Sequence, residues 1–191
     1  TFRLLLAGVA INACFSSLIL FVNYSAHYYD SFRLMRWLMG GLSATGYAAA
    51  LNMLPFTLVG GALVLAHVHH LDLLNTGADL AQSRGVNVGR TRVLLFLITS
   101  LMVGSVVAVC GPIGFVGLIV PHICRLLLGH NHRHLMPATV LLGGAFLALC
   151  DAAARIAAAP AEIPVGVITA LLGGPFFLWL LITVAADRSI E

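Results

Sequence analysis

The chain has 191 residues, of which 60% are apolar and 9% are charged, and its formal net charge is +3. Soluble domains contain roughly 45–50% apolar and about 25% charged residues, so this composition excludes a soluble globular domain and indicates an integral membrane protein. All ten basic residues are arginine and are spread between apolar stretches, which does not favour nucleic-acid binding. Without lysine, a G-x-x-x-x-G-K-[ST] loop is impossible, and any ATP chemistry must come from a partner.

Six stretches are expected to cross the membrane as helices, because about 20 apolar residues span the hydrocarbon. In chain order they are Leu4–Val22, Thr45–Ala66, Val93–Cys110, Ile113–Leu128, Met136–Ala154 and Val165–Val184. The expected fold class is therefore all-α, a polytopic transmembrane helical bundle, with residues 1–191 as a single transmembrane domain. An apolar span starts at Leu4 without a methionine or a charged leader, so the chain is expected to be a piece of a longer membrane protein.

The third and fourth crossings lie in one apolar run of 36 residues, from Val93 to Leu128. As a single helix this run would be about 54 Å long, nearly twice the roughly 30 Å hydrocarbon core. Within it, Gly111–Arg125 (GPIGFVGLIVPHICR) carries helix-breaking glycines and prolines. The run is expected to fold back on itself at GPIG, as a broken and tightly packed membrane segment.

The distribution of arginines predicts the orientation. Seven of them fall on the side of Thr1 and three on the other, and positive charge concentrates in cytoplasmic loops. The loop His67–Arg92 is then cytoplasmic and the amphipathic connection Asn23–Gly41 is external. The seven are Arg3, Arg84, Arg90, Arg92, Arg125, Arg133 and Arg188, and the three are Arg33, Arg36 and Arg155.

The cytoplasmic loop carries signals of local structure. Thr76 and Asp79 resemble a capping box at the start of a short helix, and Gly85 is a suitable left-handed stop. A second short turn, Asn87–Arg92, is expected to lead into the next crossing. Two interpretations remain open: an ordinary solvated connector, which composition favours, and a folded docking platform.

Histidines and charged pairs offer two alternative functions. The groups His67, His69, His70 and His130, His132, His134 could bind metal, although positions at the membrane edge explain them better. A histidine-metal enzyme inside the membrane is disfavoured by the lack of an H-E-x-x-H motif. Asp151 and Arg155 form the only opposite-charge pair at helical spacing near a span, and so few carboxylates disfavour an ion-coupled secondary carrier without excluding it.

The four cysteines are far apart in the sequence and lack metal-ligand spacing, so apolar packing is their expected role. They are Cys14, Cys110, Cys124 and Cys150.

Five motifs resemble a known family, the FecCD-type permease subunits of type II ATP-binding-cassette (ABC) importers for iron–siderophore complexes, haem and cobalamin. The motifs are LLLAGVAINA (4–13), WLMGGLS (37–43), GVNVGRTR (85–92), GPIGFVGLIVPHICRLLLG (111–129) and PAEIPVGVITALLGGPFFLWLL (160–181). The resemblance implies the last six helices of a ten-helix subunit in the bacterial inner membrane. It also implies alternating access and no catalysis by this chain.

The same resemblance implies the partners. They are a second permease copy, two ABC ATPase subunits that bind ATP and Mg, and a periplasmic or lipoprotein solute-binding protein. No cofactor is expected on this chain. An iron–siderophore complex is the first choice of cargo, ahead of haem and cobalamin.

Site residues also follow from the resemblance. Residues 71–92 are the coupling loop, in which the ATPase-contacting set is Thr76, Asp79, Ala81, Arg84, Gly85, Val86 and Asn87, with Arg84 a departure from the apolar residue usual there. Thr1 and Phe2 belong to the inner gate, while Asn12, Ser16 and Ser17 either face the pathway or hydrogen-bond between packed helices. Residues 32–41 resemble a short external helix. Arg155 either docks the binding protein or pairs with Asp151.

Overall fold

The computed structural model describes residues 2–42, 47–129, 131–157, 159 and 161–188, and the regular structure within these ranges is helical. The helices are α1 (Phe2–Ser25), α2 (Tyr28–Leu38), α3 (Tyr47–Ala66), α4 (Val68–Asn75), α5 (Ala78–Ser83), α6 (Val88–Cys110), α7 (Val116–Leu128), α8 (His132–Ala157) and α9 (Val165–Arg188). Five of them, α1, α3, α6, α8 and α9, are long and apolar enough to cross a membrane. The all-α class is confirmed, with α7 as a shorter apolar helix.

Helices α1 and α2 form one compact unit, Thr1–Leu38. The described side chains of α1 are largely exposed, as expected of a helix that faces lipid or other protein. Helix α2 is amphipathic and carries Asp30 in its first turn and Arg36 in its last, both favourable for the helix dipole. It begins earlier in the chain than the short external helix expected from residue 32.

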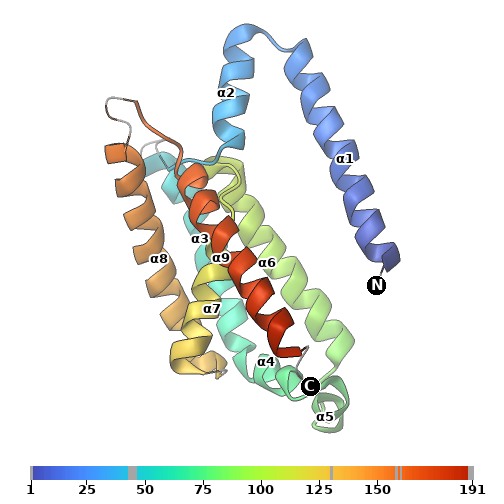
Figure 1. The fold of residues 1–191 in the computed structure, drawn as a ribbon. Helices are drawn as coiled ribbons and strands as arrows, with labels where there is room; N and C mark the ends of the chain where they lie inside the picture. Colours follow the sequence, from blue (N-terminus) through green and yellow to red (C-terminus); the bar gives the residue numbers. More distant parts are fainter. Residues whose placement is uncertain (1, 43–46, 130, 158, 160, 189–191) are drawn as a thin grey trace. The chain divides into compact units, whose positions relative to one another are not determined.

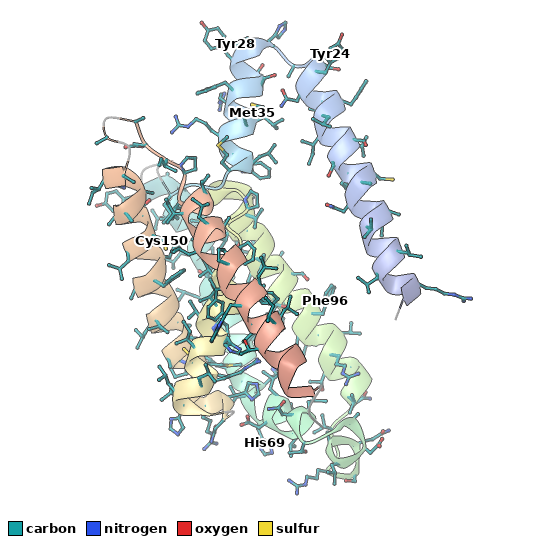
Figure 2. All side chains as sticks on the ribbon, in the orientation of Figure 1. Tyr24, Tyr28, Met35, His69, Phe96 and Cys150 are labelled. Carbon is teal, nitrogen blue, oxygen red and sulfur yellow. The ribbon has the colours of Figure 1, made fainter. Side chains whose placement is uncertain are left out.

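The second unit, Met39–Glu191, contains α3 to α9. Helix α3 packs on α6, and α7 packs on both α8 and α9, so these helices run alongside one another (Figure 1). Apolar side chains cover their outer surfaces, among them Phe96 of α6, which is 70% exposed (Figure 2). Buried Cys124 and Cys150 pack as small apolar residues, whereas Cys14 is exposed.

The apolar run from Val93 to Leu128 is broken, as expected. Helix α6 ends at Cys110, and Gly111 and Phe115 both have positive φ, 71° and 66°. The helix after the break therefore begins at Val116 rather than at Ile113, because Phe115 is held in the left-handed region. With 13 residues, α7 is about 20 Å long and is too short to cross the hydrocarbon by itself.

The non-helical stretch Gly111–Phe115 precedes α7 within the apolar run. Irregular backbone is tolerated at membrane depth only where protein or water covers it. Here the Phe115 ring fills the space beside Gly173 of α9, where a Cβ atom would overlap it. The missing side chain at Gly173 therefore makes room for the break.

Three of the glycine-containing motifs meet at the end of α6. The amide of Gly41 donates to the carbonyl of Cys110 at 2.8 Å, and the amide of Gly166 donates to the carbonyl of Gly40 at 3.0 Å. Gly40 has φ +70°, and a Cβ there would overlap the carbonyl of Pro112. These contacts join the chain before α3, the end of α6 and the start of α9 into what we name the glycine junction (Gly40, Gly41, Cys110, Pro112, Gly166).

Candidate functional site

The loop between α3 and α6 folds around a small apolar core of its own. Leu73 of α4, Ala81 of α5 and Val86 are 8%, 0% and 5% exposed and contact one another, with Leu74 and Val88 packed against them. A solvated connector has no reason to bury these side chains together. Of the two interpretations left open, the structure therefore agrees with a folded loop rather than a solvated connector. We call residues 68–87 the coupling platform, and its docking role stays a prediction.

The predicted capping box at the start of α5 is wrong. The N-cap of α5 is Gly77, with φ +117°, and in the described residues no side chain caps this helix. Thr76 instead ends α4, and its hydroxyl donates to the carbonyl of Leu73 at 2.7 Å. A threonine at a junction of two helices can serve either one, and here α4 uses it. Asp79 still lies in the first turn of α5, where a carboxylate is favourable.

The predicted stop at Gly85 is confirmed. Its φ is +84°, the amide of Gly85 donates to Gln82 at 3.0 Å, and the amide of Val86 donates to Ala81 at 3.1 Å. This pair of bonds is a Schellman motif, which commonly includes an apolar contact between the same two end positions. Ala81 and Val86 make that contact in the platform core.

Helix α6 begins directly after this stop. The side chain of Asn87 accepts from the amide of Arg90 at 3.1 Å, an N-cap that starts the helix at Val88. The expected separate turn at residues 87–92 is therefore the first turn of α6 itself. Because α6 is one continuous helix through Cys110, the platform is joined directly to a helix long enough to span a membrane.

The predicted ATPase-contacting residues divide by exposure. Ala81 and Val86 are buried and hold the platform together, whereas the others are exposed and form its outer surface. The exposed ones are Thr76, Asp79, Arg84, Gly85 and Asn87. A cavity of about 340 Å³ adjoins this surface, and it is lined by His67, His70, Gly85, Val86, Asn87, Arg90, Thr91 and Leu94.

A polar link that the sequence did not reveal ties the platform to α8. One carboxylate oxygen of Asp72, in α4, accepts from the backbone amide of His132 at 3.1 Å and lies 2.5 Å from His132 Nδ1. Burial opposes the charged carboxylate, but the hydrogen bonds from His132 and the charges of His132 and Arg133 outweigh it and lower the pKa of Asp72. In the sequence, only the position of Asp72 in an apolar stretch beside histidines indicated a polar contact, and it did not indicate which residue Asp72 would bind.

The histidine groups do not gather into a metal site in the part of the chain that the structure describes, where no cluster of three or more His, Cys, Asp or Glu could hold an ion. His67 Nδ1 lies 2.8 Å from the carbonyl of Leu63. His69 lies on α4 (Figure 2), with its ring 6.3 Å from that of His70, and His132 binds Asp72. His130 lies outside the described residues.

The predicted gate residues lie on α1, with the exception of Thr1, which lies outside the described residues. Phe2 is the first residue of α1. Asn12, Ser16 and Ser17 are exposed, and the Ser17 hydroxyl donates to the carbonyl of Ala13 at 2.9 Å within the helix. Their place on a pathway stays a prediction.

Arg155 makes the predicted pair with Asp151. Its Nε donates to Asp151 Oδ2 at 2.8 Å, and Nη1 lies 3.8 Å from Glu162. The Arg155 side chain is 48% exposed, so the guanidinium remains accessible beside two carboxylates. Any docking role must therefore compete with these two partners.

Comparisons with known proteins agree with this architecture. The profile of the FecCD transport family matches residues 1–183. The chain is 40% identical over 187 residues to the hemin transport system permease protein HmuU of Yersinia pestis, covering 98% of this chain and 56% of that protein. It is 43% identical over 193 residues to the cobalamin import system permease protein BtuC of Halobacterium salinarum, covering 100% and 50%.

A solved structure is also similar. An inward-facing conformation of a putative metal-chelate type ABC transporter superposes with a TM-score of 0.84 at 32% identity, over 93% of this chain and 58% of that one. The chain spans about half the length of the curated relatives it matches. With nearly its whole length matched, the chain belongs to the FecCD transport family of ABC transporter permeases.

Proposed function

We propose that this chain is part of the permease subunit of a bacterial ABC importer and forms its translocation pathway across the inner membrane. The observation that carries the proposal is a folded coupling platform continuous with a membrane span, in a chain of the FecCD family. ATP and Mg belong to a separate ATPase subunit, and this chain performs no covalent chemistry.

The cargo class is a metal chelate or a corrinoid. Similar permeases are named for transport of hemin, cobalamin and Fe(3+) dicitrate, all of which contain a metal held by an organic ligand. We place an iron–siderophore complex first, with haem and cobalamin as alternatives. The binding protein, rather than the pathway, carries most of the selection.

The exposed surface of the coupling platform is the proposed contact with the ATPase. It presents Asp79, Arg84, Gly85 and Asn87 around the cavity next to α6. A nucleotide-dependent difference in binding at this surface is needed, because only differential binding shifts the equilibrium between pathway conformations. Since α6 starts at Val88, platform movement tilts that span, and alternating access follows.

The remaining partners follow the same proposal. A second permease copy completes the pathway, with Thr1 and Phe2 at its inner gate and Asn12, Ser16 and Ser17 along it. Arg155 contributes to docking of a periplasmic or lipoprotein binding protein. The surrounding lipid accounts for the exposed apolar side chains of the long helices.

The proposal is tested with the full-length permease, its ATPase and its binding protein reconstituted in proteoliposomes. Uptake of a ⁵⁵Fe-loaded siderophore, haemin and cobalamin is measured with and without ATP and binding protein. We expect uptake of one cargo to require both. Uptake that is independent of ATP and follows a proton or sodium gradient would support the secondary carrier instead.

A further inference from the structure

The coupling platform reaches the membrane bundle by two routes of different physical character. The first is covalent, through His67 into α3 and through Asn87 into α6. The second is the contact of α4 with α8, in which Asp72 meets His132, a residue 60 positions away in sequence. Among the described residues, this contact is the side-chain hydrogen-bonded link between α4 and α8.

The bonds at this link are directional. One oxygen of Asp72 accepts hydrogen bonds from both the backbone amide and the ring nitrogen of His132. Both side chains are partly buried: that of Asp72 is 33% exposed and that of His132 is 18% exposed. Charge-assisted hydrogen bonds are short and depend on angle, whereas apolar contacts allow sliding. The link therefore resists displacement of α4 along α8 more than apolar packing does.

The link is distinct from ordinary capping of α8. Asn131 already provides a local cap, because its side chain accepts from the amide of Arg133 at 3.0 Å. Asp72 adds a bond to the first residue of the helix from another part of the chain. Loss of the Asn131 cap weakens the helix end alone, while loss of Asp72 also removes the side-chain link between α4 and α8.

The start of α8, close to His132, is packed against α7. Leu135, almost one turn further along α8, is 5% exposed and packs with Val120 and Cys124 of α7. Val120 and Cys124 are each 2% exposed, so this contact is closely packed. Close-packed interiors transmit displacement rather than absorb it.

We propose that Asp72 and His132 are positioning residues that transmit movement of the coupling platform to α8 and, through Leu135, to α7. The platform then drives α3 and α6 by chain continuity and the α7–α8 pair by this link. The inference rests on the proposed function, because it needs a platform that an ATPase moves.

The test uses a cysteine-free full-length permease that carries Val140→Cys, spin-labelled at that cysteine, in complex with its ATPase in nanodiscs. Val140 lies on α8 and is 74% exposed. One label on each permease copy gives a single label-to-label distance, which is measured by double electron–electron resonance. The distance change between the nucleotide-free and ADP–vanadate states is divided by the amount of trapped ADP. This ratio separates transmission from ATPase binding and turnover.

We expect Asp72→Ala to lose most of the normalised distance change, because the side-chain link between α4 and α8 is gone. Asn131→Ala, the matched control, should keep the wild-type change. Exchange of the two residues, Asp72→His with His132→Asp, should recover part of it. A wild-type change in Asp72→Ala, or an equal loss in Asn131→Ala, overturns the proposal.

Two further arms keep the result decisive. If Asp72→Ala does not assemble, Asp72→Asn and His132→Ala are measured in the same way, and a wild-type change in both overturns the proposal. The wild-type complex is measured first. If it binds no ATPase, the proposed function fails. If it binds ATPase but shows no nucleotide-dependent change at Val140, α8 does not follow the platform and the link proposal is overturned.

Discussion

Replacement of Gly85 by valine tests whether the fold of the coupling platform matters for transport. Gly85 has φ +84°, and among the described residues no atom beyond Gly85 and its two chain neighbours lies within 4 Å of the position a Cβ would occupy. The substitution therefore introduces backbone strain without a steric collision. The left-handed region disfavours a residue with a Cβ by roughly 1–2 kcal/mol, and a β-branched residue by more.

This strain falls on the Schellman motif that ends α5. If the backbone at position 85 relaxes to a negative φ, the hydrogen bond from the Val86 amide to the Ala81 carbonyl breaks and the contact between these two residues opens. A change of one or two kcal/mol alters the ratio of closed to open platform by about 5- to 30-fold. Uptake and stimulated ATP hydrolysis should fall together, while membrane insertion is retained.

The assay combines uptake in proteoliposomes with hydrogen exchange of the peptide that contains Val86. Gly85→Asn is the matched control, because asparagine tolerates the left-handed region. Gly89→Ala controls for an added side chain nearby, since its Cβ would meet only the Asn87 side chain, at 3.8 Å. Equal uptake and equal exchange protection in Gly85→Val and Gly85→Asn would refute the reasoning.

Three further predictions follow from local geometry. Gly173→Ala should destabilise the protein by about 1–3 kcal/mol, because the added Cβ overlaps the Phe115 ring. The melting temperature should fall in this variant and stay unchanged in Gly174→Ala, where the added Cβ meets open space. Arg155→Glu should slow association of the binding protein in a salt-dependent manner, and an unchanged association rate at low ionic strength contradicts the docking role. Because the pKa of Asp72 is lowered from 3.8, its contribution to stability should be complete above 3.8 and lost as the pH falls through the lowered value; a melting-temperature difference between wild type and Asp72→Asn that persists in stronger acid contradicts this.

Helical class and approximate span positions were predictable because they depend on local composition. Apolar stretches of sufficient length must be helical in lipid, where each backbone amide and carbonyl needs a partner inside its own segment. The observed α3, α8 and α9 overlap the expected crossings closely. The left-handed stop at Gly85 was equally predictable, since it depends only on the φ of Gly85 and on five neighbouring residues.

Predictions failed where two local structures compete for one group. Thr76 has the sequence of an N-cap, but its hydroxyl completes the last turn of α4.

The start of α7 was misplaced because a non-glycine residue, Phe115, adopts positive φ. That conformation is held by packing beside Gly173, which is far away in the sequence.

The sequence by itself therefore determined the membrane class, the family motifs, the broken apolar run and the left-handed stop at Gly85. Only the tertiary structure decided which motifs meet at the glycine junction and which acid binds which histidine. The physical reason is the sequence separation of the residues that interact. Helix formation and capping depend on residues within a few positions of one another. The bonds between Asp72 and His132, and between Gly40 and Gly166, exist only after separate helices have packed.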